Sequence, residues 1–289
     1  MKRIKEIAKT LFHIISSPEL LHLPGNLAFF MILSIFPILT LIGIISNYFS
    51  ISIDGVVTTL STALPNGVEQ ILLPYIEADS FTRNVIISTA FAFILASNGT
   101  HALILASNSL YGIKNSSYLK RRIKALFLIL LLIVLFIFMI SFLTYGNQIF
   151  VYILNIVTYE PINDVLYYIF AFIKWPIAMF IIFTIMRLIY ILSPDGKIYS
   201  KTTTKGAIFA TIGFTIATAL FSLYVNKFGA YDVYYGSLAK IAVLMMWVYI
   251  LSFIIVIGIA INVRAYNNYK AKEMNKMKIN EKNINVLKD

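Results

Sequence analysis

The sequence is dominated by six apolar stretches, each long enough to cross a lipid bilayer as a helix. A spanning helix needs roughly 20 mainly apolar residues. The six stretches are Leu27–Tyr48, Val85–Ala106, Ala125–Tyr145, Val165–Leu192, Gly206–Val225 and Ser237–Val263. Charged residues make up 13% of the chain, whereas a soluble domain carries about a quarter. The sequence therefore predicts an all-α, polytopic membrane protein with six transmembrane helices and no separate soluble domain.

The lysines and arginines predict how these spans are oriented. Segments rich in Lys and Arg alternate with poor ones, as six crossings require. The counts are four in residues 1–26, one in 49–84, five in 107–124, none in 146–164, three in 193–205 and seven after residue 263. Basic residues stay on the cytoplasmic side, so both ends are expected there. This distribution explains the net charge of +11 without nucleic acid. The expected partners are membrane lipids, with anionic head groups at the basic cytoplasmic loops.

Three segments outside the spans carry further signals, and they divide the chain into residues 1–26, 27–263 and 264–289. In the first, apolar residues recur at helical spacing opposite lysines, which predicts an amphipathic helix on the cytoplasmic leaflet; a plain basic anchor is the alternative. Residues 65–76, in the first outer loop, predict short interfacial helices. The third segment is rich in Lys and Asn and is expected to be a disordered basic tail.

Polar side chains cluster in the second span. Asn98 and His101 lie one helical turn apart, and Asn108 follows near the same face. Polar groups at membrane depth are costly, so they either join helices or mark a pathway. Both interpretations stay open: the residues satisfy one another and neighbouring backbone, or they line a polar cavity that opens toward the cytoplasm.

The fourth span contains Lys174 and Trp175, followed by Arg187 near its cytoplasmic end. Lys174 lies about 15 Å below the outer end of the span, at 1.5 Å per residue. A lysine at that depth is expected to face water, an acid or an anionic ligand. For Arg187, extension of the side chain toward the lower head groups is the simpler interpretation.

The turn between the last two spans is short, aromatic and weakly basic. Tyrosines at a membrane interface commonly form a belt. A shaped outer surface that takes part in a substrate pathway is the alternative. The candidate residues in this region are Lys227, Tyr231, Tyr235 and Lys240.

Several catalytic and cofactor signatures are absent from the sequence. There is no cysteine, which removes thiol nucleophiles and Cys-ligated metal centres. There is also no phosphate-binding G-x-x-x-x-G-K-[ST] loop and no H-E-x-x-H metal motif. We therefore expect no enzyme activity, no cofactor and no metal site.

An ordered series of motifs resembles the YihY/BrkB family of bacterial inner-membrane proteins. The stretch 25–37 resembles the family opening A-x-x-A-[YF]-[YF]-x-x-L-S-x-F-P, and 106–111 resembles the A-x-N-x-x-Y at the end of the second span. Later pieces follow in order to about residue 265. The residues that carry these motifs are Ser34, Pro37, Tyr111, Gly206, Gly236, Trp247 and Gly258.

The resemblance implies a six-helix protein of the bacterial inner (plasma) membrane without a settled activity. Members of the family were once labelled ribonuclease BN, and one branch is named as a virulence factor. Many members carry G-x-E-x-N late in the sixth span, whereas Ala260 takes the place of the acid here. If that acid couples transport to protons elsewhere, the coupling is in doubt in this chain.

Taken together, the sequence favours a transporter or flippase for an amphiphilic, anionic, lipid-like substrate. Lys174, the polar second span and the basic outer turn motivate this hypothesis. Two alternatives stay open: a transporter of a small ion or solute, and a non-transporting structural or regulatory membrane protein.

Overall fold

The computed structural model describes residues 18–48, 85–157, 163–228 and 237–286, and all of the regular structure in these ranges is helical. The helices are α2 (Pro18–Tyr48), α5 (Val85–Tyr111), α6 (Tyr118–Val157), α7 (Asn163–Leu192), α8 (Ser200–Phe228) and α10 (Ser237–Val286). All six are long and apolar enough to cross a membrane. The predicted all-α polytopic fold is confirmed.

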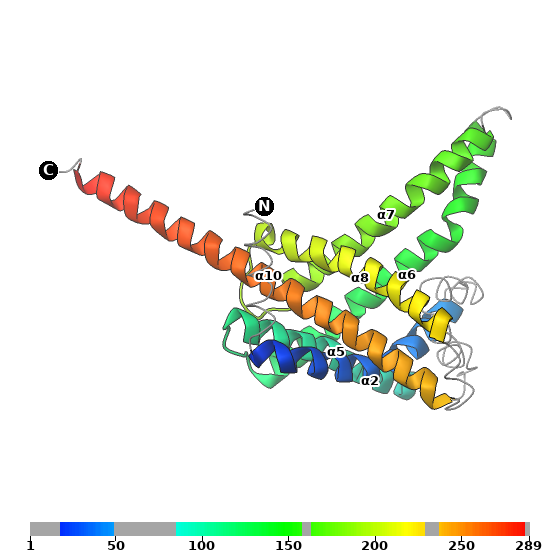
Figure 1. Ribbon diagram of the computed structural model, residues 1–289, viewed down its shortest axis with the longest axis horizontal. Coiled ribbons are helices and arrows are strands. Elements are labelled where there is room, and N and C mark those ends of the chain that lie inside the picture. The colour runs from blue at the N-terminus through cyan, green and yellow to red at the C-terminus, as the bar shows by residue number, and fades with distance from the viewer. Residues whose placement is uncertain (1–17, 49–84, 158–162, 229–236, 287–289) are drawn as a thin grey trace.

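Successive helices run in alternating directions, so the start of α2 and the end of α10 lie at the same end of the molecule (Figure 1). Each helix packs against the next along the chain, and α10 returns to contact α2 and α5. The six helices therefore form a closed ring. At the opposite end, α6 and α7 run together away from α8 and α10 (Figure 1).

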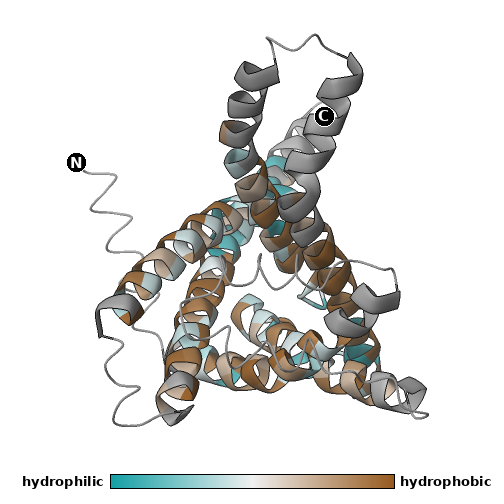
Figure 2. Ribbon diagram, turned by 90° about the vertical axis from the view of Figure 1, so that its right-hand side faces the viewer, coloured by the Kyte–Doolittle hydropathy of each residue, from teal (hydrophilic) through white to brown (hydrophobic). Residues whose placement is uncertain are grey.

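The basic residues predict that the end where α2 starts is cytoplasmic, and it is called the cytoplasmic end below. The largest buried core lies in that half of the ring, where all six helices meet. It includes Leu27, Leu103, Leu128, Tyr190, Ala207 and Val256. Figure 2 shows that apolar residues predominate along the coloured parts of the helices. Such surfaces suit a bilayer, where the solvent for a protein surface is hydrocarbon.

Small residues allow two close helix crossings. Ser34 of α2 accepts a hydrogen bond from the Gly99 amide of α5 at 2.9 Å. Gly206 of α8 lies against Gly258 of α10, and a Cβ atom at Gly206 would overlap the Gly258 carbonyl oxygen. Small residues at these points let the helix backbones approach closely, as is common between membrane helices.

The last helix differs from the disordered tail expected for residues 264–289. α10 is 50 residues long and continues to Val286. Tyr199, just before α8, stacks on Tyr266 and also contacts Tyr269, with ring centroids 5.9 and 4.9 Å apart. These contacts support the first turns beyond the span.

Other expectations fall partly or wholly outside the described residues. Residues 1–17 of the predicted interfacial helix and the predicted outer-loop helices at 65–76 lie there. Residues 18–26 belong to α2 and are continuous with the first span.

Candidate functional site

A polar cluster joins α5, α6 and α7 at their cytoplasmic ends, and Asp195 lies at its centre. Asp195 lies three residues beyond the end of α7, and its carboxylate pairs with the Lys124 ammonium of α6 at 3.1 Å. Lys124 also donates to the carbonyl oxygens of Ser193 and Pro194, at 2.9 and 2.6 Å. One lysine thus satisfies three oxygens that follow the end of α7.

Asn108 connects the same carboxylate to α5. Its side-chain amide donates to Asp195 at 2.9 Å, and its carbonyl oxygen accepts from the Asp195 backbone amide at 2.8 Å. The Asn108 side-chain amide also donates to the Asn115 side-chain oxygen at 2.9 Å. The neighbouring Ser107 and Ser193 side chains share a hydrogen bond of 2.7 Å. The cluster therefore links three successive helices through residues up to 87 positions apart.

The environment of Asp195 strongly favours its charged form. Burial acts to raise the pKa of this carboxyl. Hydrogen bonds from the Ser116 backbone, Asn108, the Ser116 side chain and Lys124 outweigh that effect and lower the pKa to about 2. Donors aimed at a carboxylate stabilise its ionised form. Asp195 is therefore a fixed negative charge at neutral pH.

A second polar group lies where α6 begins beside α5. The Arg122 guanidinium donates to the Asn98 side chain and to the Ile94 carbonyl oxygen, both at 2.8 Å. The His101 ring meets the Tyr118 ring edge-on at 5.9 Å between centroids. The buried His101 Nε2 atom has no hydrogen-bond partner among the described residues.

Other polar residues of α5 hold the helices together. Thr100 donates to the Ala125 carbonyl oxygen of α6 at 2.8 Å, and Ser97 donates to Ile94 within its own helix at 2.7 Å. Thr100 and Asn108 therefore make contacts beyond their own helix, whereas the hydrogen bond of Ser97 stays within α5.

A third group lies at the α8–α10 crossing. The Gly206 amide donates to the Asn262 side-chain oxygen at 2.8 Å, and the Tyr190 hydroxyl donates to the Ile255 carbonyl oxygen at 3.2 Å. Gly258 lies directly against that hydroxyl. Asn262 is fully buried, but its Nδ2 has no partner in the described part of the chain.

Of the remaining sequence candidates, the structure describes the side chains of Arg187 and Trp175. Arg187 donates to the Ser200 hydroxyl at 2.8 Å and links α7 to the start of α8. Trp175 on α7 is 72% exposed. Lys174, Lys227 and Lys240 lie on α7, α8 and α10, whereas Tyr231, Tyr235 and Gly236 lie outside the described residues.

Of the other motif residues, Pro37 lies inside α2. Trp247 of α10 packs against a small core cluster that contains Ala28 and Leu39. Tyr111 contacts Tyr266 edge-on, with ring centroids 5.7 Å apart. Neither the Trp247 Nε1 nor the Tyr111 hydroxyl has a hydrogen-bond partner among the described residues.

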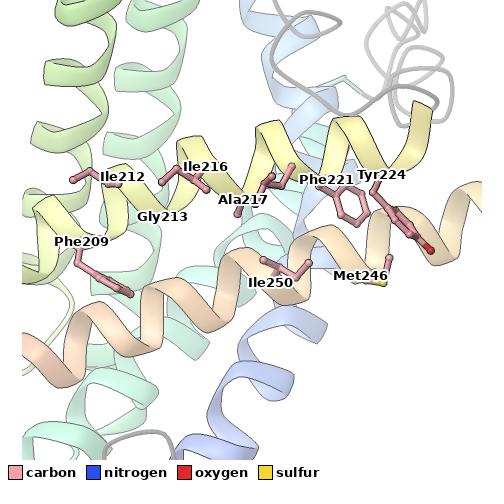
Figure 3. Close-up of a pocket in the computed structure, with 10 residues that line it drawn as sticks. Phe209, Ile212, Gly213, Ile216, Ala217, Phe221, Tyr224, Met246 and Ile250 are labelled. Carbon is pink, nitrogen blue, oxygen red and sulfur yellow. The ribbon is translucent and has the colours of Figure 1, made fainter. Parts of the chain in front are cut away.

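An apolar groove runs between α8 and α10, with a volume of about 710 Å³ (Figure 3). Eight of its lining residues come from α8 and two, Met246 and Ile250, from α10. Ile212, Ile216 and Leu220 line it and are about half exposed, whereas Ala207 and Ala210 of the same helix are buried in the core. The groove therefore opens on the outer surface of the ring, away from the core face of α8.

Sequence reasoning missed Asp195, Lys124 and the groove. A signal for Asp195 existed, since it is the only acid in a short cytoplasmic segment that also holds Lys197 and Lys201. Lys124 is the last basic residue before the long apolar run of α6. No sequence pattern marks the groove, because its lining resembles that of any lipid-facing helix.

The model of the family described as "Virulence factor BrkB" matches residues 14–282. The chain belongs to this family. The BrkB-family match covers all of the described helices except the last residues of α10. It confirms the resemblance to the YihY/BrkB family.

Known BrkB-family relatives give names rather than activities. The putative ribonuclease-like protein YfkH of Bacillus subtilis is 27% identical over 87% of this chain and 92% of its own length. A UPF0761 membrane protein of Vibrio atlanticus is 26% identical over 81% of this chain and 74% of its own. A UPF0761 membrane protein of Alteromonas mediterranea is 35% identical over 29% of this chain and 30% of its own. No solved structure matches the chain.

Proposed function

We propose that this protein is a transporter or flippase for an amphiphilic, anionic, lipid-like substrate in the bacterial inner membrane. The observation that carries the proposal is the apolar groove between α8 and α10. Its volume of about 710 Å³ falls within the ~300–1,000 Å³ of small-molecule sites. The proposal is not enzymatic, and the ribonuclease-like name belongs to a relative.

The location of the groove supports an acyl chain as its occupant. All of its lining residues lie in the candidate spans Ser200–Val225 and Ile241–Met277. A groove open on that surface is filled by lipid tails, because the hydrocarbon core contains no water. It extends from Phe209 to Tyr224 along α8, about 22 Å at 1.5 Å per residue. An acyl chain held there would therefore run along most of one span.

The overall arrangement agrees with movement of a lipid along the ring. Polar contacts join α5, α6 and α7 at the cytoplasmic end, whereas α6 and α7 diverge from α8 and α10 at the other end (Figure 1). At the cytoplasmic end Arg187 of α7 also bonds Ser200 at the start of α8. The α6–α7 pair is thus held to α8 at one end and separated from it at the other, an arrangement that suits alternating access.

Reconstitution in liposomes tests the proposal. Fluorescent anionic phospholipid is followed across the leaflets, with the wild type compared to Ile216→Trp, which fills the groove. Ile208→Trp is the matched control, because Ile208 is on the same helix, is 47% exposed against 53% for Ile216, and does not line the groove.

We expect the wild type to accelerate lipid exchange over protein-free vesicles, Ile216→Trp to reduce the rate at least fivefold, and Ile208→Trp to leave it unchanged. A wild type no faster than empty vesicles contradicts the proposal. Equal loss in both variants contradicts a role for the groove.

A second candidate is a structural or regulatory membrane protein that transports nothing. The observation that favours it is the bonding of Thr100 and Asn108, which join helices instead of facing a cavity. Under this hypothesis, variants at these residues lower thermal stability, and liposomes with the wild type show no flux of lipid or small solutes.

A further inference from the structure

We propose that Arg122 forms a binding site for the phosphate of an anionic phospholipid from the cytoplasmic leaflet, at the outer surface of the α5–α6 contact. This site is on different helices from the α8–α10 groove and does not depend on transport.

The Arg122 side chain extends in a direction that is unusual for an arginine near a membrane interface. Thr100 of α5 contacts Ala125, three residues deeper into α6 than Arg122. The Arg122 guanidinium nevertheless reaches Asn98 and the Ile94 carbonyl oxygen, which lie deeper than Thr100. The head group therefore points toward the hydrocarbon, opposite to the usual extension of arginine toward the interface.

The charge of Arg122 has no counter-charge among the described residues. Both of its hydrogen bonds go to neutral oxygens. Asp195, the nearby acid, is paired with Lys124. A guanidinium has five N–H donors, so donors remain for a further acceptor. A charge at membrane depth is costly unless an anion compensates it, and a phosphate accepts two parallel bonds from a guanidinium.

The neighbouring surface identifies the source of the phosphate as a lipid. The same stretches of the two helices carry large, exposed apolar side chains: Phe91, Ile94 and Leu95 on α5, and Leu119, Ile123 and Phe127 on α6. A free anion gains nothing from such flanks, whereas the acyl chains of a phospholipid bury them. Basic sites between membrane helices on the cytoplasmic side bind head groups of this type.

The experiment measures lipid binding to the purified full-length protein by native mass spectrometry. Phosphatidylglycerol is compared with phosphatidylcholine, and glycerol phosphate serves as a competitor without acyl chains. The variants are Arg122→Gln and, as matched control, Lys120→Gln, which removes the same charge from an exposed residue two positions away. We expect the wild type to favour phosphatidylglycerol by roughly five- to tenfold, Arg122→Gln to lose that preference, and Lys120→Gln to keep it.

Three results would overturn the proposal. They are no preference in the wild type, an equal preference in Arg122→Gln, and full competition by glycerol phosphate, which would indicate a soluble anion site. A test without substitution guards against misfolding: phosphatidylglycerol with a photoreactive acyl chain should label residues 91–95 or 119–127 of the wild type. Labelling confined to other helices would also overturn it.

Discussion

At the scale of single residues, the fixed charge of Asp195 is the most consequential feature of the cytoplasmic end. Its side chain is 8% exposed and that of Lys124 is 28% exposed. Breaking a buried ion pair by removing one partner leaves an uncompensated charge, which is strongly destabilising. The effect of this pair on stability should therefore be seen mainly when one partner is removed and the other charge is left unpaired.

Replacement of Asp195 by Asn should destabilise the protein by about 2–4 kcal/mol, because Lys124 loses its counter-charge in a partly buried site. Thermal unfolding in detergent measures the effect. In a double-mutant cycle, Asp195→Asn combined with Lys124→Gln should cost less than the sum of the single changes. Strict additivity would show that the two groups do not interact.

Low pH should weaken the interactions of the Asp195 carboxylate with Lys124 and Asn108. The pKa of Asp195 is lowered from 3.8 to about 2, so its stabilisation is complete above about pH 4 and is lost as the pH falls toward 2. The shift corresponds to at most about 2.5 kcal/mol. Unfolding temperatures measured from pH 5 to pH 2 should fall more steeply for the wild type than for Asp195→Asn. Parallel curves would contradict this assignment.

At the scale of elements, the crossing of α8 and α10 depends on the absence of side chains at two positions. A Cβ atom at Gly206 would overlap the Gly258 carbonyl oxygen and the Asn262 side chain. The backbones are too close for either helix to accommodate it without a shift. Two motifs that lie about 50 residues apart in the sequence are thus two sides of one contact.

Gly206→Ala should therefore destabilise the protein by roughly 1–3 kcal/mol, the usual cost of overpacking. Gly25→Ala on α2 is the control, since the nearest atom to its added Cβ would be 4.0 Å away. Alanine favours a helix over glycine by about 1 kcal/mol, so this control should be neutral or stabilising. Similar unfolding temperatures for the two variants would count against the close crossing.

At the scale of the whole molecule, the ring is tied by polar contacts at the cytoplasmic end and diverges at the other (Figure 1). The chain contains no cysteine, so introduced cysteines report on this arrangement without background. The hydroxyl oxygens of Ser107 and Ser193 are 2.7 Å apart, which places them well for a disulfide.

The double variant Ser107→Cys/Ser193→Cys should cross-link α5 to the end of α7 on oxidation. If transport requires the cytoplasmic end to open, oxidation should stop lipid exchange in liposomes and reduction should restore it. Each single variant is a control and should not respond. Full activity of the cross-linked protein would show that this end stays closed during transport.

The sequence by itself determined the spans, their number and the expected sides of the loops. These properties are local. Each apolar stretch must match the thickness of the hydrocarbon by its own length, and the basic residues beside it determine its orientation. The ordered motifs also identified the family, which the family comparison confirmed. Neither property depends on which helix lies beside which.

Only the tertiary structure decided which polar residues meet. Asn108 was a candidate from the sequence, but its partner Asp195 is 87 residues away, and no local pattern links them. The groove, the Gly206–Gly258 contact and the direction of Arg122 likewise depend on how each helix is rotated against its neighbours. In an all-apolar span the sequence carries little periodic signal for that rotation, so packing alone sets it.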